Sequence, residues 1–305
     1  MGTVLFTSNR PLNRAENIKS VYDAYDGDKE FFQTGRRATN WGIQPDYSSG
    51  KYSLLVADDL PNDSPGKCIF IGHGMGACKT YGLDQPYAYF SKPDLITYAI
   101  ASSEDMVPIV ARQCGISEEQ VIPLGMPRTD AYFQSEQEDH SFRYHLYAPT
   151  FRSGSWQPDW NDIHWHMPEG HKLIVKPHMV TKQLFVRNVW SSIEGYPSSI
   201  PTTPFLLKAD TVVTDYSSIM FDAMVLRKPV ILFAKDKEQY LKERGTYFPY
   251  PDRYSKYFFD NEREMTRCLE YAEWDDHDEE LRQFYAGACD GSCIERTLEL
   301  IRSVL

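Results

Sequence analysis

The fold is decided by Thr211-Val-Val-Thr-Asp-Tyr-Ser-Ser-Ile-Met-Phe-Asp-Ala-Met-Val-Leu-Arg-Lys-Pro-Val-Ile-Leu-Phe233. This pattern predicts a buried strand, a polar turn, a helix and a second buried strand, which together form the unit of a wound α/β sheet. The turn, Thr214–Ser218, falls where a strand ends and a helix begins. Backbone N–H groups and serine hydroxyls at such a corner can hold a phosphate. We therefore expect a phosphorylated ligand at the carboxyl edge of a parallel sheet.

Strands and helices alternate on both sides of this stretch. The expected strands are Val4–Thr7, Ser53–Ala57, Lys67–Ile71, Leu95–Ala101, Val121–Leu124, Tyr144–Ala148, Leu173–Lys176, Thr211–Val213 and Val230–Phe233. The expected helices are Glu16–Tyr25, a helix capped by Ser103 that ends at Cys114, Lys237–Arg244, Glu262–Ala272, Glu279–Ala288 and Ile294–Val304. Ser153–Gly170 is interpreted as a long loop. The pattern predicts two α/β domains, joined near the polar stretch Ser135–Ser141.

The composition of the 305 residues excludes several classes of protein. A net charge of −11 argues against a nucleic-acid partner, because phosphate backbones require a basic face. Six scattered cysteines without a CxxC pair are interpreted as reduced thiols and not as a metal site. The sequence has neither a secretory signal nor an apolar run of about 20 residues, so we expect a cytoplasmic protein, at most peripheral on the inner face of the membrane. The P-loop, GxGxxG and GxSxG motifs are all missing, which weakens kinase, dehydrogenase and hydrolase interpretations.

His73 lies between two glycines, directly after a predicted strand. Glycines allow the backbone to approach a ligand closely, and a histidine there can act as a general base. The alternative is a histidine that only hydrogen-bonds a neighbouring loop. Gly74 belongs to the same turn, and Lys79 and Thr80 follow it closely enough to meet an anion.

Further polar residues follow strands of the second half. Lys176 and His178 suit a diphosphate, although a buried structural histidine is an equal alternative. Arg152, with Thr150 before it, could make bidentate contacts with phosphate or could be structural. Asp222 stands one helical turn after Ser218; it could bind the two hydroxyls of a ribose, or it could equally pair with Arg227 or cap its neighbours.

One group of histidines has the composition of a metal site. His164, His166 and His171 lie near Asp162. Because strand alternation is missing here, a solvated aromatic loop is favoured over a metal centre. No metal site and no cofactor is therefore predicted.

Taken together, these motifs resemble the CDP-glycerol glycerophosphotransferase family of teichoic-acid and capsule polymer enzymes. The resemblance spans nearly the whole chain with motif order kept. It rests on Val4–Ser8, Glu16-Asn17, Gly72-His73-Gly74 with Lys79, Thr80 and Gly82, Gly125-Met-Pro-Arg128-Thr-Asp130, Ala148-Pro-Thr-Phe-Arg152, Lys176-Pro-His178, Thr214–Asp222 with Lys228-Pro229, Tyr240, Arg244–Tyr247, Asp290-Gly291 and Arg296.

The resemblance implies a GT-B-like architecture, in which two Rossmann-like domains with parallel sheets face each other across a cleft. Residues 1–137 would form the acceptor-side domain and residues 138–305 the nucleotide-binding domain, with the last helix packing back on the first. It implies transfer of an alditol phosphate, with glycerol phosphate favoured, from a CDP-alditol to a hydroxyl of a glycan, lipid-linked or soluble oligosaccharide acceptor. CMP would be released.

The resemblance also implies roles for individual residues. His73 would take the acceptor proton, His178 would assist the donor diphosphate, and Arg152 would balance its charge. Ser217 and Ser218 would hold phosphate and Asp222 the ribose. The remaining members of the expected site are Thr150, Lys176, Thr214 and Asp215 on the donor side, and Gly74, Lys79, Thr80 and Arg128 on the acceptor side.

Two rival classes share this architecture. One is a GT-B-type glycosyltransferase or epimerase that uses a UDP-sugar. The other is a binding or scaffold protein on a decayed enzyme fold. The choice of donor nucleotide separates the first rival, and nucleotide binding without CMP release would favour the second.

Overall fold

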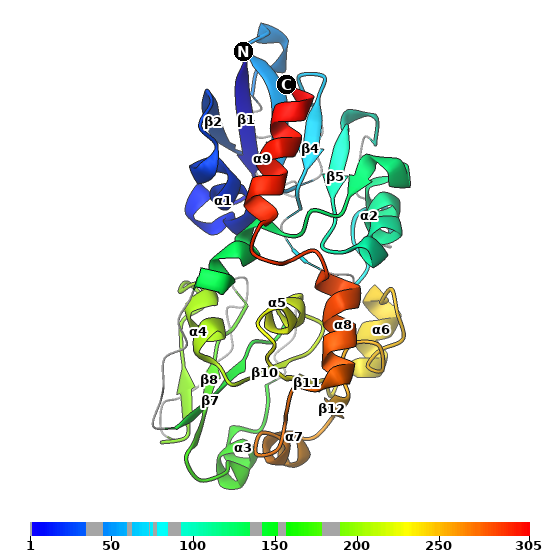
Figure 1. Ribbon diagram of the computed structural model, residues 1–305. Coiled ribbons are helices and arrows are strands. Elements are labelled where there is room, and N and C mark those ends of the chain that lie inside the picture. The colour runs from blue at the N-terminus through cyan, green and yellow to red at the C-terminus, as the bar shows by residue number, and fades with distance from the viewer. Residues whose placement is uncertain are drawn as a thin grey trace. The chain divides into compact units, whose positions relative to one another are not determined.

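The computed structural model describes residues 2–34, 45–59, 63–72, 74–75, 78–84, 93–134, 142–151, 157–178 and 190–305 (Figure 1). The chain divides into two compact units. Unit 1 comprises Met1–Gly76, Thr80–Gln134 and Gln283–Leu305, and unit 2 comprises Ala77–Lys79 and Ser135–Arg282. The predicted linker Ser135–Ser141 lies outside the described residues.

Within the described residues, unit 1 is built on a six-stranded sheet with the order β2-β1-β3-β4-β5-β6. All neighbouring strands are parallel. The strands are β1 (Thr3–Ser8), β2 (Lys29–Gln33), β3 (Tyr52–Ala57), β4 (Cys68–Phe70), β5 (Tyr98–Ile100) and β6 (Val121–Ile122). The helices are α1 (Glu16–Ala24), α2 (Val107–Cys114) and α9 (Cys293–Val304), with the 3₁₀ segments η5 (Glu104–Met106) and η7 (Pro127–Gln134).

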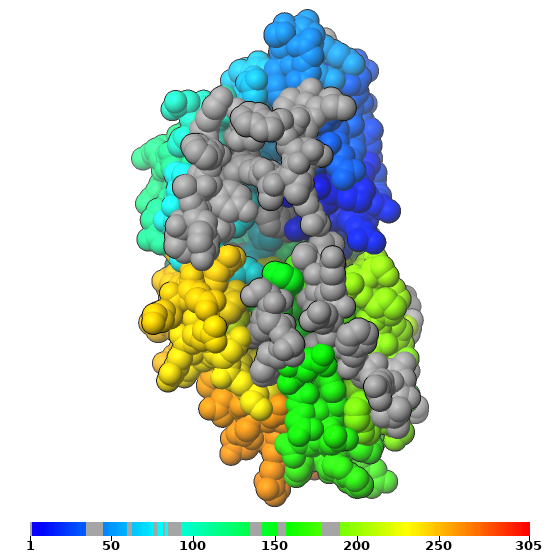
Figure 2. Space-filling view, turned by 180° about the vertical axis from the view of Figure 1, so that it is seen from behind, coloured from blue at the N-terminus to red at the C-terminus, as the bar shows by residue number. Residues whose placement is uncertain are grey.

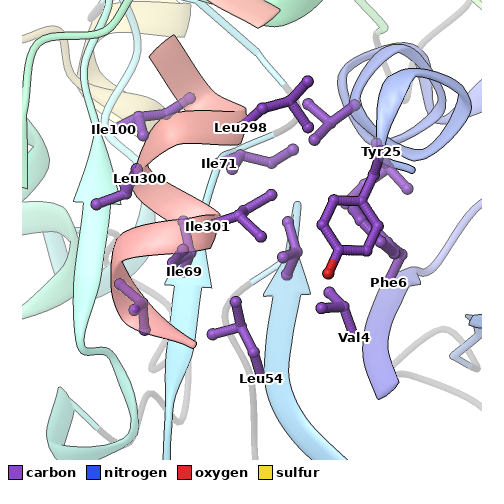
Figure 3. Packing of buried hydrophobic residues seen from close by; sticks show 14 of the residues in the cluster. Val4, Phe6, Tyr25, Leu54, Ile69, Ile71, Ile100, Leu298, Leu300 and Ile301 are labelled. Atoms are coloured by element: carbon purple, nitrogen blue, oxygen red, sulfur yellow. The ribbon is translucent and has the colours of Figure 1, made fainter. Parts of the chain in front are cut away.

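The core of unit 1 combines the first strands of the chain with its last helix. In Figure 3, Leu298 and Ile301 of α9 lie with Val4, Leu54 and Ile69 of the sheet. Helix α9 packs beside α1, so both helices cover the same face. Burial of these aliphatic side chains stabilises the arrangement by about 1.5–3 kcal/mol for each side chain. Residues nearly 300 positions apart in sequence are thereby brought into one domain.

Polar contacts of two residues, Asp130 and Arg296, fix the beginning of α9 to residues 124–130, which include the Gly-Met-Pro-Arg-Thr-Asp motif. The carboxylate of Asp130 accepts hydrogen bonds from the N–H groups of Cys293 (3.0 Å) and Ile294 (2.7 Å). The guanidinium of Arg296 donates to the carbonyl of Leu124 (2.9 Å) and pairs with Asp290 (2.9 Å). A carboxylate at a helix N-terminus satisfies donors that the helix itself leaves unpaired. Asp130, Asp290 and Arg296, which are part of the family resemblance, therefore stabilise the fold of unit 1.

Unit 2 repeats the same design. Its described residues form a six-stranded parallel sheet with the order β12-β11-β10-β7-β8-β9. The strands are β7 (Arg143–Tyr147), β8 (His171–Val175), β9 (Ile193–Gly195), β10 (Thr211–Thr214), β11 (Val230–Phe233) and β12 (Tyr257–Phe259). The helices are α3 (Trp160–His166), α4 (Thr203–Lys208), α5 (Ile219–Val225), α6 (Lys237–Arg244), α7 (Glu262–Cys268) and α8 (Asp276–Ala286), whose last residues belong to unit 1.

The sheet of unit 2 is covered on both faces. Every residue of β10 and β11 is buried, as expected for central parallel strands. Helices α3 and α7 contribute Trp160, Ile163 and Met265 to the core cluster, whereas α5 packs against β10 and β11. Helix α6 lies at the surface of unit 2, in the yellow region of Figure 2.

Two local predictions are wrong for clear physical reasons. The segment Ser153–Gly170 contains helix α3, because the side chain of Asp159 accepts hydrogen bonds from the N–H groups of Asn161 and Asp162 and so caps the helix. Ser103 makes no cap hydrogen bond, because its hydroxyl donates to the carbonyl of Phe284 (2.5 Å). The short elements β2, β9, α4 and β12 are present but were not predicted.

Candidate functional site

The strand order of unit 2 reverses between β7 and β10. The chain runs from β7 through β8 to β9 on one side and then returns to place β10 on the other side of β7. In open α/β sheets, ligands bind at the carboxyl ends of the strands beside such a reversal. Residues 148–151, which follow β7, and residues 215–218, which follow β10, therefore flank the expected ligand position.

Asp215 connects these two loops. Its side chain is fully buried, and both carboxylate oxygens accept the N–H of Thr150, at 2.8 and 3.0 Å. The N–H of Tyr216 donates to the same carboxylate at 2.6 Å. One residue earlier, the hydroxyl of Thr214 donates to the carbonyl of Ala148 (2.7 Å). A buried carboxylate is stable only with such donors, so Asp215 holds the corner in one conformation.

Ser217 and Ser218 supply the donors of this corner. Among the described residues, neither their hydroxyls nor the N–H groups of Ser217, Ser218 and Ile219 have a protein acceptor. Both serines are half-buried. Helix α5 has only seven residues, so its dipole is short and the local N–H and O–H groups are the main source of attraction for an anion.

Lys79 belongs to unit 2, although its neighbours in sequence belong to unit 1. Its ammonium donates to the hydroxyl of Thr150 (3.2 Å), and its backbone forms an antiparallel bridge with Thr246. The carbonyl of Cys78 accepts hydrogen bonds from the N–H of Tyr247 (3.1 Å) and the hydroxyl of Tyr254 (3.2 Å). The structure therefore places Lys79 on the side of the Asp215 corner.

Lys176 and His178 follow β8 at the same edge of the sheet. Lys176 is 2% exposed, and its ammonium donates to the carbonyl of Pro177 (3.2 Å). His178 is half-buried, with its ring centroid 6.5 Å from that of Phe151. An ammonium held at this depth can contribute strongly to the binding of an anion, because water screens it little.

The other donor-side predictions have different outcomes. Asp222 is buried on α5, one turn beyond the serines. Arg227, which the sequence offered as a partner for Asp222, donates to the carboxylate of Glu279 (3.1 Å). Arg152 lies outside the described residues.

Apart from Lys79, the acceptor-side predictions lie in unit 1. His73 is outside the described residues, but the flanking Gly72 is held by Asn17, whose amide donates to its carbonyl (3.0 Å). The side-chain oxygen of the same Asn17 accepts the N–H of Arg128 (3.1 Å). Arg128 and Asn17 are both buried, whereas Gly74 is exposed and Thr80 is half-buried. Asn17 therefore joins the histidine-bearing turn to the motif that contains Arg128.

A second polar corner in unit 1 was missed from the sequence. Its strand order reverses between β1 and β3, and Ser8 and Asp58 lie at the carboxyl ends of these two strands. The hydroxyl of Ser8 donates to the Asp58 carboxylate (3.0 Å) and accepts the N–H of Arg10 (3.0 Å). Burial, with the charge of Asp59, raises the pKa of Asp58 to about 7. Asp58-Asp59 follows a predicted strand without the neighbouring serines that mark the unit 2 corner, so its place at the reversal needed the strand order.

The histidines considered as metal ligands have separate partners. His166 contacts Asp162 (3.2 Å), His164 contacts the hydroxyl of Ser192 (2.7 Å), and His171 contacts His145 (2.9 Å). Among the described residues, no three His, Cys, Asp or Glu side chains come together in a way that would hold a metal ion.

Two Rossmann-like units, each with a polar corner where the strand order reverses, define the class of GT-B-like α/β proteins, and this predicted fold class is confirmed. The model of the CDP-glycerol:poly(glycerophosphate) glycerophosphotransferase family matches residues 52–301. The chain belongs to this family, as the sequence motifs predicted.

Curated relatives agree with this membership. The chain is 28% identical over 302 residues to the teichoic acid ribitol-phosphate polymerase TarK of Staphylococcus aureus, covering 81% of this chain and 58% of the relative. It is 29% identical over 215 residues to a teichoic acid glycerol-phosphate primase of Bacillus subtilis, covering 63% and 56%. The chain thus spans little more than half the length of these relatives.

Solved structures share the fold. The wall teichoic acid polymerase TagF superimposes with a TM-score of 0.76 at 16% identity, covering 99% of this chain and 88% of that one. A UDP-GlcNAc 2-epimerase from Neisseria meningitidis superimposes with a TM-score of 0.61 at 12% identity, covering 99% and 100%. At these identities the likeness concerns the architecture alone. None of the helices in the described part of the chain is long and apolar enough to cross a bilayer.

Proposed function

We propose that this protein transfers an alditol phosphate from a CDP-alditol to a hydroxyl of a glycan or polymer acceptor in the synthesis of a cell-surface polymer. The observation that carries the proposal is the family match over residues 52–301. The geometry supports it, because the family motifs of unit 2 converge on one polar corner at the reversal of strand order. The relatives include both ribitol-phosphate and glycerol-phosphate enzymes, so the donor is proposed as a class.

In the proposed reaction, the acceptor oxygen attacks the β-phosphorus, which carries the alditol. The bond from this phosphorus to the oxygen bridging to CMP breaks, and CMP leaves with the bond's electron pair. The proton of the acceptor hydroxyl passes to a general base, which we propose is His73. Positioning and charge stabilisation supply most of the acceleration in such transfers.

The donor site is proposed to consist of the unit 2 corner. Ser217 and Ser218 would bind a phosphate oxygen through their N–H and O–H groups, for which the described part of the chain provides no acceptor. Arg152, Lys176 and His178 would balance the charge of the diphosphate. Asp215, already engaged by backbone N–H groups, positions the corner.

Three further residues complete the donor site. Thr150 and Thr214 hold the two loops together through their hydrogen bonds. Asp222 is proposed to bind the ribose hydroxyls of the cytidine. Asp222 lies on α5, one turn after the serines. This position supports an arrangement in which the serines contact the phosphate and Asp222 contacts the ribose next to it.

The acceptor side is proposed to lie in unit 1. It would include His73, Gly74, Thr80 and Arg128, with Asn17 holding the turn that carries the histidine. A lipid-linked or soluble oligosaccharide is the proposed acceptor. We propose that the protein acts in the cytoplasm, at most in peripheral contact with the membrane.

The test is CMP release, measured with CDP-glycerol and CDP-ribitol across a panel of acceptor glycans. Release of CMP that depends on an acceptor, with at least one of these donors, is the expected result. UDP-GlcNAc serves as the comparison donor. No turnover of either CDP-alditol, together with thermal stabilisation by the UDP-sugar alone, would instead assign the protein to the glycosyltransferase and epimerase class.

A further inference from the structure

We propose that Lys79 is a donor-site residue that binds the diphosphate of the CDP-alditol, an assignment that rests on the proposed function. Its position in sequence, six residues after His73, suggests an acceptor-side role. The three-dimensional structure assigns it differently, because Ala77–Lys79 is the short segment from the first half of the chain that belongs to unit 2.

The backbone of this segment is anchored on both sides of the peptide that joins Cys78 to Lys79. The carbonyl of Cys78 accepts two hydrogen bonds, from Tyr247 N–H at 3.1 Å and from the Tyr254 hydroxyl at 3.2 Å. Lys79 itself pairs with Thr246 in an antiparallel bridge. Tyr254 is fully buried. Its hydrogen bond to Cys78 therefore fixes the segment to the interior of unit 2.

The side chain of Lys79 continues from this anchor toward the donor corner. Its ammonium lies 3.2 Å from the hydroxyl of Thr150, the residue whose N–H binds both oxygens of Asp215. Burial raises the pKa of the Cys78 thiol, and the charges of Lys79 and Asp215 act on it in opposite directions. Because Thr150 lies in the loop that follows β7, its contact with Lys79 places the ammonium beside the reversal of strand order.

The chemistry of the corner calls for a cation at this place. Ser217 and Ser218 contribute neutral donors, and Asp215 contributes a carboxylate that would repel a phosphate, so a cation beside Asp215 is needed in addition to Lys176, which follows β8. A diphosphate carries two negative charges when it bridges a nucleoside and an alditol. A lysine ammonium binds phosphate as a point charge, and Lys79 offers it from a half-buried position where screening is reduced.

The experiment is isothermal titration calorimetry of wild type, Lys79→Met and Lys79→Arg with CDP-glycerol, CMP and cytidine. Loss of a charge-assisted contact should weaken CDP-glycerol binding by about tenfold or more. CMP, with one phosphate, should lose less, cytidine should be unaffected, and Lys79→Arg should recover part of the affinity. A merely structural role would weaken all three ligands together.

Lys242→Met is the matched control, since Lys242 is an exposed lysine of α6 in the same unit. It should bind CDP-glycerol as wild type does. Lys79→Gln, which keeps a donor for Thr150, replaces Lys79→Met if the latter melts at a lower temperature than wild type. Wild-type affinity in the charge-removing variant overturns the role of Lys79 alone, whereas a wild-type protein that binds no CDP-alditol overturns the proposed function with it.

Discussion

The two units place an aspartate at the same topological position and use it in different ways. Asp215 in unit 2 and Asp58 in unit 1 both follow a strand at the reversal of strand order. Asp215 accepts backbone N–H groups from both flanking loops, whereas Asp58 accepts a serine hydroxyl and has a pKa raised to about 7 by burial. One fold therefore supplies a corner locked by its backbone in unit 2 and a corner that titrates near neutral pH in unit 1.

This difference matches the division of labour in the proposed reaction. A corner whose backbone is fixed, and whose serine N–H groups have no acceptor in the described part of the chain, suits a charged diphosphate, which needs preorganised donors. A corner that exchanges a proton near neutral pH suits the reacting hydroxyl of the acceptor, which is itself uncharged. The predictions below test this contrast, beginning with the largest expected effect.

The substitution His73→Ala should distinguish the roles of the two units most clearly. We expect turnover to fall by about 10²–10⁴-fold, because the acceptor proton loses its base. Donor affinity should stay close to wild type, since the donor corner lies in unit 2. Steady-state CMP release together with calorimetry of CDP-glycerol checks both halves. Turnover close to that of wild type would remove His73 from the mechanism.

His145 should make unit 2 sensitive to acid. Its pKa is lowered to about 3 by burial, then by the neighbouring charges of His171 and Arg143. The folded state therefore binds fewer protons than the unfolded chain between about pH 6.5 and 3, so stability is lost as pH falls through this range, by roughly 4–5 kcal/mol in total.

The check is the free energy of urea unfolding as a function of pH. His145→Gln keeps a polar atom toward His171 (2.9 Å in the wild type) but does not titrate. Below pH 6.5, the unfolding free energy of His145→Gln should change less steeply with pH than that of wild type. The difference in slope should correspond to at most one proton taken up on unfolding. Charges facing the pair, on Asp210, Glu270 and Arg143, are the same in both proteins. Identical pH slopes for the two proteins would contradict the assignment.

Asp58 should make the stability of unit 1 depend on pH in the opposite direction. Because its pKa is raised from 3.8 to about 7, the folded state binds the extra proton. This contribution is fully present below about pH 4 and is lost as pH rises through 7, by roughly 4 kcal/mol. Asp58→Asn keeps an acceptor for Ser8 without titrating. Its unfolding free energy should decline less than that of wild type between pH 4 and 7, and an unchanged decline would count against the buried acid.

The smallest expected effect concerns the donors of the unit 2 corner. The double variant Ser217→Ala, Ser218→Ala should weaken CDP-glycerol binding several-fold, because two hydroxyls are lost while the N–H groups stay. Ser191→Ala, at an exposed serine of unit 2, serves as the control. Calorimetric affinity equal to wild type in the double variant would show that these hydroxyls do not touch the donor.

Local pattern was sufficient for the central strands and the exposed helices. Strands β10 and β11 were predicted at Thr211–Val213 and Val230–Phe233 from short apolar runs, which are typical of a sheet covered on both faces, and both strands are indeed fully buried. Helix α6 has the predicted bounds. The family motifs also identified the corner residues around Asp215, since polar residues after a strand carry a signal in sequence alone.

Other features were missed, one despite a local signal and two because they depend on contacts that no local pattern contains. Helix α3 was missed because its Trp, Pro and Gly surroundings suggested a loop, although Asp159 supplied a cap signal. Asp58 needs the strand order, which is a property of the whole sheet. The place of Lys79 depends on a bridge to Thr246, which is far along the chain. The positions of Asp58 and Lys79 therefore follow from tertiary contacts, which local sequence propensity does not contain.

The most direct test of the central claim is a crystal structure of the protein soaked with CDP-glycerol. We predict that diphosphate oxygens lie within hydrogen-bonding distance of Ser217, Ser218 and the ammonium of Lys79, beside the carboxylate of Asp215. A diphosphate bound elsewhere, with this corner closed by protein atoms, would contradict the claim.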